Sequence, residues 1–444
     1  GGLLNGVQGT GTITSGVQNI PNPPTPWDTW GNGATPPFAI PEVNCQAAVG
    51  MTCSIAALNP NITTPFVTTW TLNVQHAFTN NLSLEVAYVG DHGSNLMGIR
   101  DINQPAVGAG WTPAAITACD TGMGCATDPV AEQAARPFNT AFPYLGNIYQ
   151  MANIYRSNYD GLQVTMTSRN YHGLDMVAGY TYAHALDDVG ANWDFGAGLG
   201  LPQDATHPGN EYAGSDFDMR HRFTLSAVYS IPGIEAPGQL LKGWQLISII
   251  SLYSAQPWGP MDTSDDISGT GEGNDRWDFV GSPSDFTSGP NSIPYYAPGT
   301  PQTSPGGICS NAANTAALQQ SLAAFGCYAQ GKSAMIPPAL GTFGTMGRNV
   351  FRDSGFRNWD FSVAKNWKFG ERFGAQFRAE FFNVLNHPNF ANPFGGQNGF
   401  GMNDPSVLGP GFGCGCATPD FAASNPVLGS GGSRSIQLGL KLLF

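Results

Sequence analysis

The densest group of oxygen ligands in the chain is an acidic, glycine-rich segment between residues 262 and 276. It carries Asp262, Asp265, Asp266, Asn274 and Asp275. Hard oxygen ligands spaced by glycines are able to wrap a Ca²⁺ ion, which takes roughly six to eight oxygens. The spacing is not that of an EF-hand, and a solvated acidic loop is the alternative interpretation. Ca²⁺ is therefore the one cofactor that the sequence suggests.

The eight cysteines fall into four close couples. They are Cys45 with Cys53, Cys119 with Cys125, Cys309 with Cys327, and Cys414 with Cys416. None has the spacing of a zinc site, and no histidine stands near enough to complete one. The even count and local pairing predict small disulfide loops made in an oxidising compartment, with free thiols as the alternative. The ring closed by Cys414 and Cys416 would be strained.

Two common sequence motifs of hydrolases are absent. The chain has no Gly-x-Ser-x-Gly elbow and no His-Glu-x-x-His. His221 lies between two arginines and is interpreted as a surface residue at the start of a strand rather than a base. Arg378, Glu380 and Lys441 are interpreted as ion-pairing groups on one polar face rather than a substrate site. The sequence predicts no catalytic residue and no enzyme.

Composition narrows the class of protein. Only 11% of the residues are charged, against about 25% in a typical soluble domain. The net charge of −13 argues against nucleic acid as a partner, because phosphate binding needs a basic surface. No apolar run approaches the roughly 18 residues of a membrane-spanning helix. Strands of a membrane barrel remain open, since they cross in about nine to eleven alternating residues.

Strict alternation of apolar and polar residues marks nine segments as strands. In the last one, Ile436, Leu438, Leu440, Leu442 and Phe444 share a face, which is the period-2 pattern of a strand. Aromatic residues near strand ends, among them Trp359, Trp367, Tyr180, Tyr182 and Tyr229, fit an interfacial girdle. The nine segments are residues 66–78, 82–89, 159–168, 174–185, 219–229, 244–254, 358–363, 373–381 and 433–444.

The connections between these strands alternate strictly between short turns and long stretches. The longest, 255–355, is expected to be irregular apart from one short helix at 314–324. All four cysteine couples fall in the long stretches. Compact soluble domains rarely contain such loops, whereas outer-membrane barrels have short periplasmic turns and long outer loops. The predicted fold is all-β: an antiparallel transmembrane β-barrel with long disulfide-bearing extracellular loops.

The strand count predicts an incomplete barrel. We expect residues 1–65 to be an irregular extracellular segment and residues 66–444 to form the carboxyl-terminal part of the barrel, with its last residue on the periplasmic side. Nine strands leave open edges, which cannot face lipid. The chain also begins without Met. We therefore expect a processed product or fragment, completed by an absent segment or by another chain.

Several motifs, in order along the chain, resemble one family. They include Asp218-Met219-Arg220-His221-Arg222-Phe223, and the full set lies at 69–75, 86–90, 100–105, 157–163, 180–185, 218–223 and 378–387. They are similar to the barrels of Oar-like TonB-dependent receptors of the acidobacterial type. The resemblance implies an amino-terminal regulatory-like domain, a plug and a TonB-engaging segment, none of which is visible here. TonB would be a partner only through that absent region.

The function that follows is the barrel portion of an Oar-like outer-membrane receptor or transporter for an unidentified extracellular ligand, in contact with outer-membrane lipid. The alternative is a structural, cell-surface β-rich subunit that self-assembles or pairs with another chain. A secreted soluble β-protein that binds glycans is the third hypothesis. Detergent dependence and heat-modifiable migration separate the barrel from the soluble protein.

Overall fold

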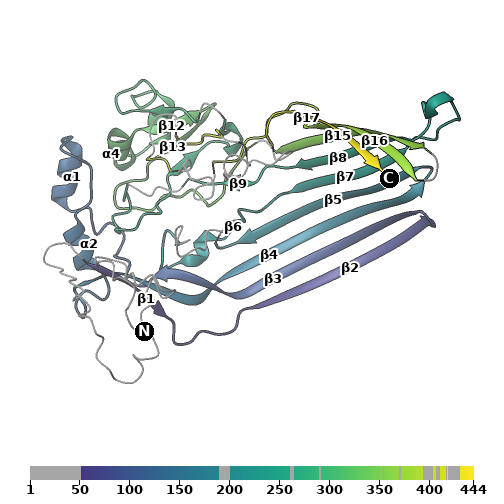
Figure 1. Ribbon diagram of the computed structural model, residues 1–444. Helices are drawn as coiled ribbons and strands as arrows, with labels where there is room; N and C mark the ends of the chain where they lie inside the picture. The colour runs from purple at the N-terminus through teal and green to yellow at the C-terminus, as the bar shows by residue number, and fades with distance from the viewer. Residues whose placement is uncertain are drawn as a thin grey trace, which may run out of the picture.

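One large, open antiparallel sheet dominates the computed structural model (Figure 1). The structure describes residues 52–189, 201–260, 265–289, 292–353, 355–369, 372–393, 404–406, 411–416, 418 and 431–444. Nine long strands of this sheet, which we call the wall, pair in the order β17-β16-β15-β8-β7-β5-β4-β3-β2. Their bounds are β2 Phe66–Thr79, β3 Leu82–Asp101, β4 Leu145–Tyr171, β5 Leu174–Asp187, β7 His221–Ser230, β8 Trp244–Tyr253, β15 Phe356–Phe369, β16 Phe373–Phe382 and β17 Ser435–Leu443.

The nine predicted strands are confirmed, and each consecutive wall pair is antiparallel. Two short strands were not expected. β1 (Cys53–Leu58) runs parallel to the start of β4, and β6 (Ala213–Gly214) pairs with the end of β5. The first falls inside the region predicted to be irregular. Its side chains do not alternate cleanly, so the sequence pattern could not identify it. Among the described residues the sheet is not closed, because β2 and β17 each have one neighbour.

The strand register gives the wall one apolar face. Leu440 lies opposite Phe377, Phe377 opposite Lys365, and Lys365 opposite Trp244. The same face continues through Leu225 on β7 to the other edge of the sheet. Its outer leucines are well exposed, Leu440 by 69% and Leu72 on β2 by 67%. We call this surface the apolar face, and the opposite one the polar face.

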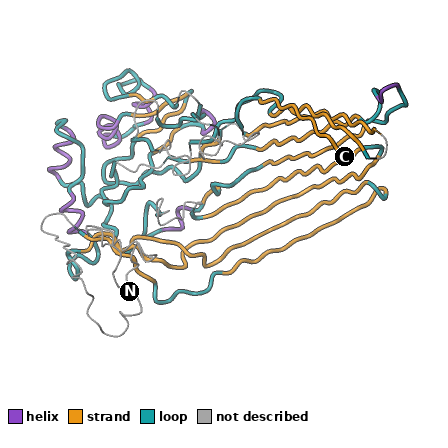
Figure 2. Tube along the Cα trace, viewed as in Figure 1, coloured by secondary structure: helices purple, strands orange, loops and turns teal. Residues whose placement is uncertain are grey.

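The two ends of the wall differ in what connects the strands. At one end, which we call the turn end, tight turns join β2 to β3 and β4 to β5. The connection between β7 and β8 is the long one there and contains the 3₁₀ helix η4 (Pro237–Gln239). All other helices lie at the opposite, loop end (Figure 2). β3 and β4 are the longest strands, with 20 and 27 residues, and continue toward the loop end.

The segment expected to be irregular, 255–355, instead contains folded structure, which corrects the sequence prediction. It forms a four-stranded sheet in the order β10-β13-β12-β11 and a two-stranded sheet of β14 and β9. We call residues 257–353 the loop domain. The bounds are β9 Pro257–Trp258, β10 Asp278–Val280, η5 Pro283–Asp285, β11 Tyr295–Tyr296, α3 Ile308–Ala312, α4 Ala316–Phe325, β12 Cys327–Gln330, β13 Ser333–Ile336 and β14 Phe351–Arg352.

The loop domain has a core of its own, built mainly from aromatic rings. Trp258, Phe286 and Phe351 are fully buried, and Phe412 from a later loop packs against the same cluster. The predicted helix at 314–324 is confirmed as α4, which begins after the N-cap Thr315. A core of residues distant in sequence has no periodicity, so alternation could not reveal it.

Two further helices fill the connection between β3 and β4. α1 (Pro113–Asp120) and α2 (Pro129–Ala135) each begin at a proline, and the side chains of Thr112 and Asp128 accept hydrogen bonds from their first turns. The 3₁₀ helix η3 (Pro208–Glu211) lies between β5 and β6. No helix in the described ranges is long and apolar enough to span a membrane.

Candidate ligand-binding region at the loop end

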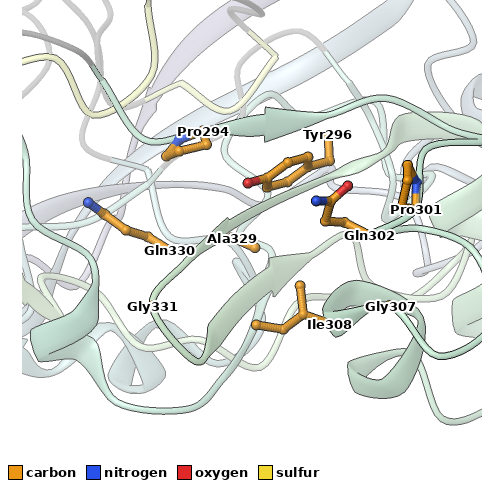
Figure 3. A pocket seen from close by; sticks show the side chains of 9 residues that line it. All are labelled: Pro294, Tyr296, Pro301, Gln302, Gly307, Ile308, Ala329, Gln330 and Gly331. Atoms are coloured by element: carbon orange, nitrogen blue, oxygen red, sulfur yellow. The ribbon is translucent and has the colours of Figure 1, made fainter.

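A cavity of about 500 Å³ opens on the loop domain beside α3 (Figure 3). The ring of Tyr296 from β11 and the side chain of Gln330 from β12 border it, and no charged side chain lines it. The lining residues are Pro294, Tyr296, Pro301, Gln302, Gly307, Ile308, Ala329, Gln330 and Gly331. An aromatic ring beside amide groups suits a neutral ligand that carries both apolar and hydrogen-bonding groups.

A second cavity of about 460 Å³ lies next to the first, and the two share Ile308 and Gly331. Its lining adds Asn311 on α3 and Lys332 at the β12–β13 turn. The pair of cavities therefore flanks α3, one on the side of β11 and β12, the other on the side of β10 and β13. Together the two cavities form a hollow on the loop domain, and among the lining residues Lys332 is the one cationic group.

The walls of these cavities are held rigidly. A disulfide joins Cys309 on α3 to Cys327 on β12. The hydroxyl of Tyr295 donates to the carbonyl oxygen of Phe325 at 2.8 Å and so fixes β11 to the end of α4. Such bracing keeps a site preformed, which lowers the ordering cost of binding.

Arginines of the loop domain attach it to the wall. Arg348 contacts the carboxylate and the main-chain oxygen of Asp187 at the end of β5, the latter at 2.6 Å. Arg276 donates to Glu211 on η3 at 2.6 Å. These groups are largely buried, and buried charge pairs fix one geometry because breaking them leaves an uncompensated charge.

Asp218 is the centre of a second attachment. Its carboxylate accepts hydrogen bonds from the Ala185 N–H at 2.9 Å and from Arg220 at 2.9 Å, and it also contacts Arg352 of the loop domain. Burial alone would raise the pKa of Asp218, but the Ala185 and Arg352 hydrogen bonds outweigh it and lower that pKa. The Asp218–Phe223 motif found in the sequence therefore serves as a joint.

The third attachment combines carboxyl groups with one arginine. Arg136 on α2 lies 3.3 Å from Asp101 at the end of β3 and 3.9 Å from Glu272 of the loop domain. Burial raises the pKa of Glu272 to about 10, and the neighbouring Asp101 adds to the effect. Burial likewise raises the pKa of Glu132 to about 7. The raised pKa favours the protonated form of Glu272 at neutral pH.

In the acidic segment proposed for Ca²⁺, two of the carboxylates accept hydrogen bonds from main-chain N–H groups of the same loop. Asp266 accepts hydrogen bonds from the N–H groups of Thr270 at 3.0 Å and Gly271 at 2.8 Å, and Asp275 accepts one from Ser268 N–H at 2.6 Å. Within the described part of the chain, no three His, Cys, Asp or Glu side chains gather as a metal site. Asp265 is half-buried, and that burial together with the nearby Asp404 raises its pKa. Asn274 is half-buried, and Asp262 lies outside the described residues.

Three of the expected disulfides have both cysteines among the described residues, and all three are present. They join Cys119 to Cys125, Cys309 to Cys327 and Cys414 to Cys416. Cys53 is also disulfide-bonded, whereas Cys45, its expected partner, lies outside the described residues. The bonds with described partners lie at the loop end, in connections between wall strands.

The other residues singled out in the sequence lie on the wall. Arg378 pairs with Glu380 at 3.4 Å on the polar face of β16, and Lys441 lies opposite Gln376. His221 is exposed and its Nδ1 lies 2.8 Å from the Tyr180 hydroxyl. Register places the predicted girdle residues on the apolar face: Tyr180, Tyr182, Tyr229, Trp359 and Trp367. Sequence reasoning missed the joint-forming arginines, although the motifs around Asp101 and Asp218 contain carboxylates that these arginines contact.

Comparisons with known proteins add a family and several solved structures. The family described as outer membrane beta barrel domain matches residues 4–410. The outer membrane transporter YddB from Escherichia coli is 8% identical with a TM-score of 0.37, and the match covers 88% of this chain and 34% of that one. The ferric citrate transporter FecA is 11% identical with a TM-score of 0.32, and the match covers 85% of this chain and 31% of that one. The toluene transporter TodX from Pseudomonas putida is 8% identical with a TM-score of 0.18, and the match covers 72% of this chain and 56% of that one.

The chain therefore spans about a third of the length of the first two structures. A search of the curated proteins found no match.

Proposed function

The chain belongs to the outer membrane beta barrel domain family and is a protein of the outer membrane; on that premise we propose that it forms part of the wall and the outer lip of a receptor or transporter for an extracellular ligand. The loop domain, with its two cavities, would receive the ligand at the lip. The wall would carry it through the membrane as part of a complete barrel. This is the transport class that the sequence motifs suggested, with the ligand unidentified.

The observation that carries the proposal is the apolar face. It extends across the nine strands, and its residues Leu72, Leu225 and Leu440 come from both edges and the middle of the sheet. A soluble protein rarely exposes so large an apolar surface to water, whereas the outer surface of a membrane barrel is apolar where it contacts lipid. The opposite face carries Arg378, Glu380 and Lys441, as a water-filled lumen requires.

Strand direction supports completion of the barrel by further strands. β2 and β17 both run from the loop end to the turn end, so the two free edges are parallel to each other. Direct closure, or closure by copies in the same orientation, would need parallel junctions. An odd number of additional strands gives a closed barrel with every pair antiparallel, as bacterial barrels have. We infer that such strands, from the same protein or from another chain, complete the wall.

The Oar-like assignment and the dependence on TonB are parts of the same proposal. Two motif residues that suggested them, Asp101 and Asp218, lie in the joints between wall and loop domain. The plug and the TonB-engaging segment would lie in the part of the receptor that this chain does not include.

Heat-modifiable gel migration of the protein extracted from outer membranes tests the proposal. We expect a compact form before heating, extraction only with detergent, and protection of the wall strands from protease. Recovery of a folded protein in buffer without detergent would overturn it.

A structural subunit that assembles through its edges is the second candidate function. The free edges of β2 and β17 favour it, because unpaired backbone groups are a template for strand addition. Cross-linking between these two strands in neighbouring copies would support the subunit. Cross-linking of both edges to other strands of one barrel would support the receptor.

A further inference from the structure

A lysine is buried on the apolar face near the turn end of the wall. Lys365 on β15 is 1% exposed, and register places it between Phe377 and Trp244. Its ammonium group lies over the rings of Trp244 and Trp367, 5.4 and 5.2 Å from their centroids. A charge on a lipid-facing surface is costly unless it is covered and hydrogen-bonded. Something must therefore shield it.

The connection between β7 and β8, residues 231–243, provides this shield. Lys365 donates to the main-chain oxygens of Gln239, at 2.5 Å, and Lys242. The indole N–H of Trp244 donates to the Leu240 oxygen at 2.7 Å. Three carbonyl groups of the connection thus lie against side chains of the apolar face. The connection is folded back onto the surface that faces lipid, instead of turning directly into β8.

The same connection protects the exposed part of β15. β15 extends past the start of β8, and there the side-chain amide of Gln239 replaces a strand partner. Its Nε2 donates to the Lys368 oxygen at 2.6 Å, and its Oε1 accepts from the Lys368 N–H at 3.1 Å. A positive φ of 55° at Gln239 and of 63° at Gly238 bends the chain into this position. The connection is therefore a docked, ordered element.

Docking leaves three large apolar side chains pointing away from the protein. Ile234, Leu240 and Leu241 are 67%, 62% and 54% exposed. The connection projects at the turn end, beside the ends of β15 and β16 (Figure 1). These side chains are continuous with the apolar face through Trp244, so the surface that contacts lipid does not stop where the strands end.

Lysine is concentrated at this end of the molecule. The chain has five lysines, and Lys332 is the one in the loop domain. The remaining four, Lys242, Lys365, Lys368 and Lys441, lie in the connection or near the turn ends of β15 and β17. Ammonium groups on long stems next to apolar side chains suit the boundary between acyl chains and anionic headgroups.

We propose that the β7–β8 connection is an interfacial anchor that inserts Ile234, Leu240 and Leu241 among the phospholipids at the turn end of the wall, with Lys242 at the level of the headgroups. The proposal rests on the membrane wall proposed above. The partner is a lipid surface because the exposed side chains lie next to the apolar face. The Glu235 carboxylate nearby is neutralised by Lys242 at 2.6 Å.

Photo-cross-linking from single positions tests the anchor in the full chain within outer membranes. The photoreactive residue p-benzoylphenylalanine replaces Leu240, with Leu162 on the apolar face of β4 and Val130 on α2 as reference positions. Both reference side chains are exposed. We expect phospholipid adducts, identified by mass, at Leu240 and Leu162 and none at Val130. Heat-modifiable migration confirms that each variant is folded.

The reference positions separate the two proposals. Lipid at Leu162 but protein adducts or none at Leu240 would overturn the anchor and leave the membrane wall intact. Absence of lipid adducts at both positions would overturn both.

A charge variant tests the position of Lys242 at the headgroups. In Lys242→Gln, we expect the ratio of phosphatidylglycerol to phosphatidylethanolamine adducts at Leu240 to fall several-fold. Lys332→Gln in the loop domain is the matched control and should leave the ratio unchanged. An unchanged ratio in the Lys242 variant would overturn the role of this lysine.

Discussion

The wall and the loop domain use the same residue types in opposite ways. In the loop domain, aromatic side chains such as Trp258 and Phe351 are fully buried and stack on one another. On the wall, Leu72, Leu438 and Leu440 are about two-thirds exposed. The loop domain thus buries its apolar side chains in a core, whereas the wall exposes them on one face. The difference shows that the two regions are adapted to different solvents.

The joint between the regions follows from that contrast. Neither the aromatic core nor the apolar face is shared between them, so charged groups make the attachment. Arg276 and Arg348 of the loop domain contact the carboxylates of Glu211 on η3 and of Asp187 at the end of β5. Directional, buried ion pairs fix one orientation, which non-directional apolar contact would not do. Four changes test this difference between the wall and the loop domain.

Removing a core ring should have the largest effect. Phe351→Ala deletes a side chain packed 5.3 Å from Phe286 and 5.0 Å from Trp258, and such losses cost about 3–5 kcal/mol. We expect protease to cut the loop domain much faster while the wall keeps its heat-modifiable migration. Leu440→Ala on the lipid-facing surface is the control and should change neither readout. Equal sensitivity of both variants would contradict the comparison.

A charge on the apolar face should have the next largest effect. Leu225→Arg places a guanidinium on the lipid side of β7 and should destabilise the wall by roughly 2–4 kcal/mol. Ser226→Arg places the same group on the polar face, one residue along, and should be nearly neutral. The urea midpoint of unfolding from bilayers measures both. The assignment of the faces would fail if the order were reversed.

Loss of the charge at the Asp218 joint should have a smaller effect. Asp218→Asn leaves Arg352 and Arg220 without their anion, and both arginines keep some contact with water, so we expect a loss of about 2 kcal/mol. Hydrogen exchange should accelerate at Ala185 N–H and around Arg352. Asp120→Asn on the exposed end of α1 is the control. Unchanged exchange in the Asp218 variant would show that the joint is not maintained by charge.

The smallest effect is a pH dependence of the third attachment. The folded pKa of Glu272 is raised from 4.5 to about 10, so between these values the folded state binds a proton that the unfolded state has lost. Its stabilising effect is complete below about pH 4.5 and is lost as the pH rises toward 10. We expect faster protease cleavage of the loop domain at pH 9 than at pH 6.

Glu272→Gln should remove most of that difference and stabilise the attachment at pH 9, because the amide has no proton to lose. Glu235→Gln at the turn end is the control and should preserve the pH dependence. A Glu272→Gln variant that keeps the full pH dependence would assign it to another group.

The sequence predicted the wall well because the pattern of a strand is local. Alternation in nine segments located nine strands, and it also assigned single residues such as Phe377 to the apolar face. The pairing of neighbours followed from short turns, as between Thr79 and Leu82. β1 was missed because it lies parallel to β4 and far from it in sequence, so no turn announces the pair.

The loop domain was largely missed because its order comes from contacts between distant residues. Phe412 packs on Trp258, which lies more than a hundred residues earlier. The expected Ca²⁺ site shows a related limit: the glycines and aspartates around Asp266 suit a tight loop as well as a metal. The ion pairs of the joints could not be predicted either, because the sequence around an arginine does not show which distant carboxylate it contacts.

The length of β4 determines how far the lip of the protein reaches. A tilted strand crosses the apolar layer in roughly ten residues, and β4 has 27, so more than half of it stands clear of the bilayer. Its partner β3 turns polar in that part, with Asp91 and His92. The loop domain is thus raised on a rigid stem, and bulky ligands that cannot approach a membrane surface closely would still come within its reach.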